Sequence, residues 1–301
     1  MHLGPAPSSH LEPLRFGDRC WEWGQRSYLM AILNATPDSF SGDGLLTDGD
    51  PVSAALRSAE AAVAGGADIL DLGAESTRPG AQAVDARAEL VRLLPLLRAI
   101  KRRFAVPVSV DTSKAEVAEA VLAEGADWIN DVWGLQGDPR LAEVLARSRA
   151  PIVLMHNRAA ADKVARREGL GSHYEGLAYQ DLLADIAAGL GQSLELALAA
   201  GISRDRVLLD PGIGFGKTPE QNLELLDRLG ELCSFELPIL IGTSRKSFIG
   251  LTLGLPPDER VEGTAATVAI AIARGADVIR VHDVAAMARV ARMTDAIVRR
   301  V

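Results

Sequence analysis

The sequence predicts an α/β fold, a (β/α)₈ TIM barrel with an N-terminal β-hairpin. Three observations predict it. From residue 28 onward, short runs rich in valine, isoleucine and leucine alternate with longer helical stretches. Those runs do not alternate with polar residues, as expected of parallel strands that are buried on both faces. Helical stretches end in a repeated Gly-Ala-Asp turn at residues 66–68, 125–127 and 275–277, where the glycine ends the helix and a new strand begins.

The spacing of these units fits the size of a barrel. Eight strand–helix units over about 275 residues suit a (β/α)₈ barrel, whose usual length is about 250 residues. An open doubly wound sheet has the same local pattern and stays the structural alternative. We expect one barrel domain over residues 14–301 of this 301-residue chain. Residues 1–13 contain three prolines, two serines and a glycine, and we expect them to form a disordered arm.

The first element that we expect is a β-hairpin lid. Residues 14–28 carry two turn signals, Gly17-Asp18 and Gly24-Gln25, around a short run that includes two tryptophans. The eight barrel strands are expected at Tyr28–Ala35, Ala67–Gly73, Val106–Asp111, Trp128–Val132, Pro151–His156, Val207–Asp210, Pro238–Gly242 and Val278–His282.

The helical stretches between the strands show the 3.6-residue period of amphipathic helices. They are expected at Val52–Ala64, Ala86–Arg103, Lys114–Ala123, Asp138–Arg147, Leu177–Ala200, Pro219–Gly230, Val261–Ala273 and Asp283–Val301. Residues 157–176 are polar and contain glycines, so we expect a mobile surface loop there.

Composition narrows the classes of function. A net charge of −8 argues against nucleic acid or an anionic membrane as the main partner, because either would need a basic surface. Cys20 and Cys233 belong to no CxxC or Cys/His cluster, so neither a disulfide framework nor a zinc site is indicated. The N-terminus lacks the apolar segment of a signal peptide, and no apolar run approaches the ~20 residues of a membrane span. We therefore expect a cytoplasmic protein.

The stretch VLLDPGIGFGK, residues 207–217, is the strongest single motif. It falls one residue short of a Walker A loop, which needs glycine where Pro211 stands. A dinucleotide fingerprint fails in the same way, because its third glycine would fall at Lys217. What remains is a buried strand that ends in Asp210 and a glycine-rich turn, as at the edge of a ligand-binding crevice.

Polar residues stand at the carboxyl end of every expected strand. They are Asn34, Asp71, Asp111, Asn130, His156, Asp210, Ser244 with Lys246, and Arg280 with His282. In a barrel these ends face one mouth, where active sites are built. A purely structural rim would mix glycine, serine and apolar residues. The composition of this rim therefore predicts a site that accepts hydrogen bonds from its ligand.

A cationic corner is expected at the same mouth. Its members are Arg78, Arg245, Lys246, Arg280 and His282, and such groups bind phosphate. The amide oxygen of Asn34 could ligate Mg²⁺, with phosphate oxygens and water as the other ligands.

Structural interpretations of single rim residues stay open. His156 is as well explained as a packed, hydrogen-bonded core histidine. Arg245 could be a surface charge, and Asp71 could orient the loop that follows its strand. Asp131 and Asp283 are expected to cap the helices after them.

Eight motifs in this order resemble the dihydropteroate synthase family. They are ILNATPDSFSGDG, DLGAESTRPG, SVDT, IND, LMH, DPGIGFGK, GTSRKSF and RVHD. The resemblance covers residues 28–301. It implies a (β/α)₈ barrel that joins dihydropterin hydroxymethyl diphosphate to p-aminobenzoate, with Mg²⁺, and releases pyrophosphate. It also implies a homodimer, and inhibition by sulfonamides that imitate p-aminobenzoate.

The resemblance implies a role for each matching residue. The expected pterin contacts are Asp111, Asn130, Met155, Asp210, Lys246 and Arg280. The expected diphosphate contacts are Asn34, which also holds the metal, with Thr77, Arg78, Arg280 and His282. The expected p-aminobenzoate contacts are Phe40, Thr77, Pro79, Phe215 and Ser247. The catalytic residues would be Asp111, Asp210, Lys246, Arg280 and His282.

The charges suggest a dissociative substitution. A neutral aromatic amine needs no strongly tuned base before it attacks. Loss of pyrophosphate leaves positive charge on the pterin methylene, which Asp111 and Asp210 would stabilise. Arg280, His282, Lys246 and Mg²⁺ would accept the departing anion.

Two motifs depart from the common family form, and two other functions stay open. The first loop has SFSGDG in place of a serine followed directly by Asp, and Ala74 replaces a glycine in the second. Both departures lie in the two loops that are expected to close over p-aminobenzoate, so they affect loop closure and not the strand-end ligands. A methyltransferase acting between methyltetrahydrofolate and a corrinoid protein shares the barrel and pocket but would not need STRPG, SRKSF and a diphosphate corner together. A non-catalytic pterin-binding paralogue is expected to have lost a strand-end ligand, and none is lost here.

Overall fold

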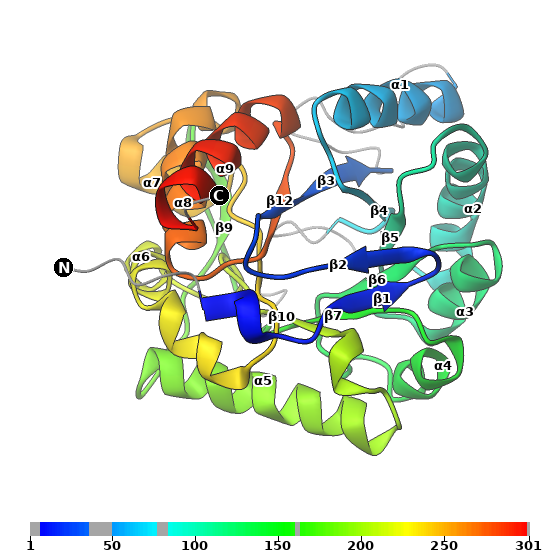
Figure 1. Cartoon of the computed structure of the whole chain (residues 1–301). Helices are drawn as coiled ribbons and strands as arrows, with labels where there is room; N and C mark the ends of the chain where they lie inside the picture. The colour runs from blue at the N-terminus through cyan, green and yellow to red at the C-terminus, as the bar shows by residue number, and fades with distance from the viewer. Residues whose placement is uncertain (1–6, 36–49, 77–83, 160–162, 300–301) are drawn as a thin grey trace.

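Eight parallel strands form a nearly closed ring with helices on its outside, as the computed structural model in Figure 1 shows. The structure describes residues 7–35, 50–76, 84–159 and 163–299. The barrel strands are β3 Tyr28–Asn34, β4 Ile69–Gly73, β5 Val108–Asp111, β6 Trp128–Asp131, β7 Ile152–Met155, β10 Val207–Asp210, β11 Leu240–Ile241 and β12 Val278–Val281. The helices are α1 Pro51–Ala64, α2 Ala86–Arg103, α3 Ala115–Ala123, α4 Arg140–Ser148, α5 Leu182–Ala199, α6 Pro219–Asp227, α7 Ser247–Leu253, α8 Val261–Ala273 and α9 Val284–Val298.

Closure of the sheet separates a barrel from an open sheet. The strand order is β10-β7-β6-β5-β4-β3-β12-β11, and every neighbouring pair is parallel. A parallel bridge joins Leu209 of β10 to Ile239, just before β11, and the backbone N–H of Leu209 donates to the carbonyl of Pro238 at 3.0 Å. The two edges of the sheet therefore meet, which confirms the predicted barrel.

The Gly-Ala-Asp turns join helix ends to strand starts. Gly66, Gly125 and Gly275 have φ angles of 99°, 92° and 103°, a left-handed conformation that glycine adopts without steric cost. The aspartate that follows each of them accepts a hydrogen bond from the backbone of a neighbouring strand. The donors are Leu29 N to Asp68 at 2.8 Å, Val108 N to Asp127 at 2.8 Å, and Ile239 N to Asp277 at 3.1 Å. The repeated tripeptide thus links adjacent strands at their amino ends.

The predicted hairpin is present, and it covers the amino-terminal end of the barrel. Strands β1 Leu14–Phe16 and β2 Arg19–Trp21 pair antiparallel around Gly17 (Figure 1, dark blue). Their apolar side chains form a second core with the first residues of the barrel strands, among them Trp128 and Tyr28. Trp21 stacks on Tyr28 with ring centroids 4.1 Å apart. The hairpin is therefore a plug at the end opposite the strand-end rim.

Residues expected to be irregular differ from the expectation in two places. The arm predicted to be disordered contains a 3₁₀ helix, η1 Pro7–His10, in which Ser8 is buried. The loop expected over residues 157–176 contains an antiparallel hairpin, with β8 Val164–Arg167 and β9 Gly171–Tyr174. Helix α7 and the 3₁₀ helices η2 Arg204–Arg206, η3 Leu229–Phe235 and η4 Pro257–Glu259 were not expected from periodicity, because each is too short to show it.

Helix α5 is the one described helix that is long and apolar enough to cross a membrane by length and composition. It lies along the outside of the barrel beside β7, between α4 and α6 (Figure 1). Its buried leucines, such as Leu183 and Leu190, pack in the main hydrophobic core. Packing on the barrel therefore accounts for its apolar side.

Candidate active site

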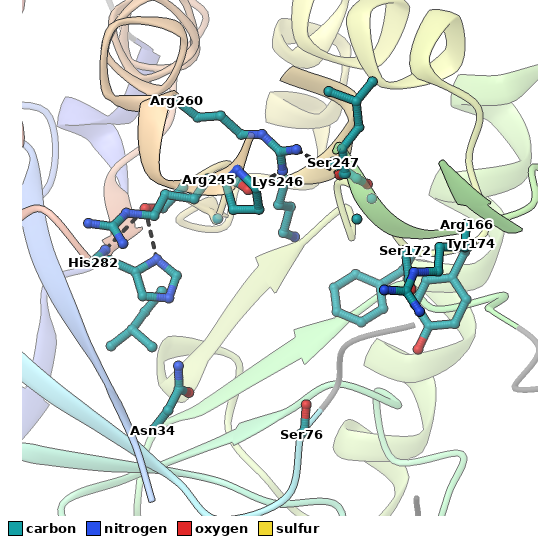
Figure 2. A pocket seen from close by; sticks show the side chains of 18 of the residues that line it. Asn34, Ser76, Arg166, Ser172, Tyr174, Arg245, Lys246, Ser247, Arg260 and His282 are labelled. Carbon is teal, nitrogen blue, oxygen red and sulfur yellow. Dashed lines mark hydrogen bonds between the residues drawn. The ribbon is translucent and has the colours of Figure 1, made fainter. Parts of the chain in front are cut away.

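The carboxyl ends of the strands surround a cavity of about 720 Å³. Most of the expected site residues that the structure describes line it: Asn34, Asp111, Phe215, Lys246, Ser247, Arg280 and His282. Figure 2 shows Asn34, Lys246 and His282 on separate elements with their side chains directed into this space. Residues that are distant in the sequence therefore meet at one mouth.

Three further expected residues are buried in the strand ends beside the cavity. Asn130 pairs in register with Asp111 across β5 and β6, and Met155 pairs with Asp210 across β7 and β10. Asn130, Met155 and Asp210 are nearly inaccessible to solvent. Phe40, Thr77, Arg78 and Pro79 lie outside the described residues.

Arg280 of β12 holds two buried carboxylates together. Its Nε donates to Asp71 Oδ2 at 2.6 Å, and its Nη2 donates to Asp111 Oδ2 at 3.0 Å. Asn130 Nδ2 also donates to Asp71 Oδ2, at 3.2 Å. Asp71 is fully buried in β4, so it serves to orient Arg280 and Asn130. The sequence left open whether Asp71 orients a loop, and the structure instead shows it paired with these two side chains.

Burial shifts the pKa values of this group. The pKa of Asp111 is raised to about 8, because burial and the nearby charge of Asp71 outweigh the attraction of Arg280. For Arg280, burial lowers the pKa, but the carboxylates of Asp71 and Asp111 raise it by more. The cluster therefore keeps its guanidinium charge, while the proton occupancy of Asp111 changes as the pH passes through about 8.

Lys246 and Asp210 form a second charged pair at the mouth. Burial lowers the pKa of Lys246 to about 8, against the opposing attraction of Asp210. The pKa of Asp210 is raised by burial, although Lys246 and the N–H of Gly212 act against this. Lys246 Nζ donates to the carbonyl of Ile213 and lies 4.7 Å from the centroid of the Phe215 ring. Lys246 therefore contacts the ring of Phe215 and is attracted by the charge of Asp210.

His282 and Arg245 are both fixed by neighbouring side chains. The Ser244 hydroxyl accepts from the backbone N–H of His282 at 3.1 Å and lies 3.0 Å from its Nδ1 (Figure 2). Arg245 makes two hydrogen bonds to Asp283, at 2.9 and 2.6 Å. Asp283 makes no capping bond to α9, so the expectation that it caps this helix is wrong: its carboxylate is engaged by the guanidinium. Asp131 accepts from the N–H groups of the turn that follows it instead of from a helix.

The glycine-rich loop after Asp210 is held by Lys217, which the sequence did not single out as a functional residue. Its buried Nζ donates to the carbonyls of Gly212 at 2.9 Å and Phe215 at 3.2 Å, and lies 3.3 Å from His156 Nδ1. Burial lowers the pKa of Lys217 to about 7 and that of His156 to about 3. Of the two interpretations of His156, site residue or packed core histidine, the structure supports the core histidine. In the sequence, the Walker A motif fails at Pro211, so no function was assigned to Lys217 at the end of the same stretch.

The second unexpected part of the site is the β8–β9 hairpin. Arg166, Ser172 and Tyr174 from its two strands line the cavity (Figure 2). The signals in the sequence were the two glycines at 169 and 171, which have φ of 72° and 81° and form the turn. Arg166, Arg167 and Glu168 before that turn, and the polar Ser172 and His173 after it, hid the short strands.

Comparisons with known proteins agree with this geometry. The sequence profile described as "Pterin binding enzyme" matches residues 30–282. A protein from Clostridium beijerinckii named dihydropteroate synthase is 44% identical over 288 residues, covering 95% of this chain and 100% of its own. A crystal structure of a dihydropteroate synthase from Clostridium difficile in the presence of pteroic acid has a TM-score of 0.83 and 43% identity, covering 93% and 99% of the two chains. One from Xanthomonas albilineans with 4-aminobenzoic acid has a TM-score of 0.84 and 38% identity, covering 95% and 98%.

Proposed function

The chain belongs to the pterin-binding enzyme family, and from this membership we propose that it catalyses the dihydropteroate synthase reaction. It would condense dihydropterin hydroxymethyl diphosphate with p-aminobenzoate, a transferase reaction of folate biosynthesis, and release pyrophosphate. The observation that carries the proposal is the cavity in which Asp111 and Lys246 meet Arg280 and His282. A heterocycle that donates hydrogen bonds suits the carboxylate of this set, and an anionic tail suits its cationic side chains.

The carboxylate half would bind the pterin. The amino-pyrimidine edge of a pterin presents two parallel N–H donors, which a carboxylate such as Asp210 accepts bidentately. Asp111 and Asn130 would contact other parts of the ring, beside Met155, and Lys246 would donate to the acceptor side. Support comes from the register, since Asp111 stands opposite Asn130 and Asp210 opposite Met155 at the ends of four strands.

The cationic half would bind the diphosphate and receive it as it leaves. Departure of pyrophosphate leaves positive charge on the pterin methylene, and the carboxylates of Asp111 and Asp210 stabilise that charge. Arg280 and His282 stabilise the negative charge on the departing oxygen, with Lys246 beside them. The amine of p-aminobenzoate then attacks the methylene and loses its proton to water. No covalent link to the protein is needed in this sequence.

Mg²⁺ is part of the proposal, with Asn34 as its protein ligand. No group of three or more His, Cys, Asp or Glu side chains within the described residues could hold a metal ion. A single amide oxygen from Asn34 fits an ion whose other ligands are diphosphate oxygens and water, as Mg²⁺ prefers. When bound, it would reduce the negative charge of the diphosphate. Asn34→Ala should raise the Mg²⁺ concentration that half-maximal activity requires.

Thr77 and Arg78 are proposed at the diphosphate, and Phe40, Thr77 and Pro79 at p-aminobenzoate, from the resemblance of their motifs. Phe215 and Ser247 are proposed beside p-aminobenzoate because both line the cavity next to Lys246. A homodimer is proposed from the resemblance as well, and a cytoplasmic location from the sequence features given above. Sedimentation velocity of the purified protein tests the homodimer.

The direct test of the proposed function is a coupled binding and turnover assay. Purified protein is mixed with dihydropterin hydroxymethyl diphosphate, p-aminobenzoate and Mg²⁺, and dihydropteroate is measured by chromatography. We expect product with the full mixture, and little product when Mg²⁺ is chelated. Binding of the diphosphate without product would instead support a non-catalytic paralogue. Turnover that requires a corrinoid protein and methyltetrahydrofolate would support the methyltransferase.

A further inference from the structure

The β8–β9 hairpin presents three polar or aromatic side chains on one face. Its register pairs Arg166 with Ser172 and Val164 with Tyr174. Side chains alternate between the two faces of a strand, and directly paired residues share a face. Arg166, Ser172 and Tyr174 therefore lie on the same face of the hairpin, whereas Arg167 lies on the opposite face.

The face with Tyr174 is turned toward the glycine-rich loop of the site. Tyr174 and Phe215 stack with ring centroids 6.1 Å apart and an interplanar angle of 29°. Phe215 also lies beneath the ammonium group of Lys246. One aromatic ring thus joins the lysine of the proposed pterin subsite to the hairpin.

The hairpin is held in this position from two sides. Arg260, at the start of α8, donates from Nη2 to the carbonyl of Leu170 in the hairpin turn at 2.8 Å. Just after the hairpin, the backbone N–H of Leu177 donates to the carbonyl of Gly216 at 3.1 Å. The hairpin is therefore anchored both to the start of α8 and to the loop that carries Phe215.

The charges on this side of the cavity suit an anion. Arg260 is buried, and its guanidinium hydrogen bonds go to three backbone carbonyls, those of Leu255, Arg245 and Leu170. Arg166 is exposed at the cavity wall, and no hydrogen bond or ion pair to another described residue engages its guanidinium. The hairpin turn also carries Glu168, so the anion is expected on the strand face and away from the turn.

We propose that the β8–β9 hairpin is a wall of the subsite for the aromatic amine, with Tyr174 extending the aromatic surface of Phe215 and Arg166 pairing with the carboxylate of the amine. The proposal rests on the function proposed above, which requires an aromatic amine with a carboxylate as second substrate. Figure 2 shows Arg166, Ser172 and Tyr174 together on the side of the cavity opposite Arg245 and His282, which leaves the diphosphate corner separate.

The test compares two amines in four variants. For each variant, KM and kcat are measured with p-aminobenzoate and with uncharged 4-aminobenzamide, and KM is measured for the pterin diphosphate. Arg166→Gln should raise KM for p-aminobenzoate about threefold to fivefold, as expected of an exposed ion pair, and leave the other two KM values unchanged. Arg102→Gln, an exposed arginine near the end of α2 that does not line the cavity, is the matched control and should behave as wild type.

The aromatic contribution has its own pair of variants. Tyr174→Leu should raise KM for both amines by a similar factor, because both present the same ring. Tyr174→Phe should restore the wild-type values, since it keeps the ring that stacks on Phe215.

Three results would overturn the proposal. An unchanged KM for p-aminobenzoate in Arg166→Gln, or an equal rise in Arg102→Gln, would show that no specific pair forms at Arg166. An equal rise with 4-aminobenzamide would show that the arginine does not act on the carboxylate. Absence of dihydropteroate with the wild-type protein would overturn the proposed function, and the hairpin proposal with it.

Discussion

The amino-terminal end of the barrel is filled with aromatic rings, whereas its carboxyl-terminal end holds charged side chains around a cavity. At the amino end, Trp21 stacks on Tyr28, and Trp21 and Phe16 both contact Trp128. At the carboxyl end, Arg280 binds two buried carboxylates and Lys246 faces a third. The amino end is covered by the separate β1–β2 hairpin, which supplies Phe16 and Trp21, whereas the carboxyl end surrounds a cavity.

The carboxylates at the two ends differ in their partners. At the amino end, Asp68 and Asp127 accept from backbone N–H groups of neighbouring strands, which fixes strand spacing, and each is also paired with a basic side chain, Arg26 or Lys101. At the mouth, Asp111 is paired through a side chain, and its pKa is raised to about 8 by burial. Buried charge is costly unless it is fully paired. We infer that the amino end supplies stability and that the mouth keeps charged groups for its ligands.

The largest expected effect comes from removing the aromatic plug. Trp21→Ala should lower the free energy of unfolding by about 3–5 kcal/mol, because it opens a cavity among stacked rings. The kcat/KM of the folded protein should change less than about twofold, since the plug lies at the far end of the barrel. Urea denaturation and steady-state kinetics measure the two quantities. The control is Trp133→Ala, an exposed tryptophan, which should leave both nearly unchanged. A large kinetic effect of Trp21→Ala would mean that the two ends are coupled.

The converse experiment changes a carboxylate at the mouth. Asp210→Asn should lower kcat/KM about 100-fold to 1000-fold, because the amide presents only one acceptor to the pterin edge. The free energy of unfolding should not fall, since burial raises the pKa of this carboxyl and an uncharged amide avoids the same cost. Asp127→Asn, at the amino end, should do the opposite: a loss of about 1–3 kcal/mol in stability with unchanged kcat/KM. Equal kinetic losses in both variants would contradict the division between the ends.

A smaller effect is expected from the lysine that holds the glycine-rich loop. Lys217→Met leaves the carbonyls of Gly212 and Phe215 without their donor, so the loop should loosen and KM for p-aminobenzoate should rise about tenfold. The matched variant is Lys101→Met, which breaks a half-exposed ion pair with Asp127 at the amino end. It should cost less than about 1 kcal/mol in stability and leave KM unchanged. If Lys217→Met keeps the wild-type KM, the lysine does not position Phe215.

The smallest effect is a change in pH dependence. The charge of Lys246 is present below its pKa of about 8 and lost above it, whereas the carboxylate of Asp111 is gained as pH rises through about 8. The kcat/KM for the pterin diphosphate should therefore be bell-shaped, with a maximum near pH 8 and a fall of about threefold by pH 9. Lys246→Arg keeps its charge over this range, so the alkaline fall should disappear and the acidic rise remain. An unchanged alkaline limb in that variant would assign it to another group.

The sequence predicts the barrel well because its signals are local. Strands buried on both faces have uninterrupted apolar runs, and each Gly-Ala-Asp turn marks a helix end and a strand start. The β8–β9 hairpin was missed because its strands are half-exposed, β8 carries two arginines and β9 is mostly polar, so neither an apolar run nor clear alternation appears. Its position depends on contacts with Arg260 and Phe215, which are distant in the sequence.

The site residues also divide into those that the sequence predicts and those whose contacts only the structure shows. Asp111, Lys246, Arg280 and His282 were found because strand-end residues of a barrel share one mouth. The partners could not be found in this way: the pairing of Arg280 with Asp71, and of Arg245 with Asp283, depends on side-chain directions that strand position does not give. Lys217 is likewise defined by its buried contacts and not by its motif.

The most direct test of the proposed site is a crystal structure of the chain with dihydropterin hydroxymethyl diphosphate. We predict that the amino-pyrimidine edge lies against the carboxylate of Asp210, within hydrogen-bond distance of both oxygens, with the diphosphate at Arg280 and His282. A pterin bound elsewhere, or bound in the mouth with its diphosphate against Asp111 and Asp210, would contradict it.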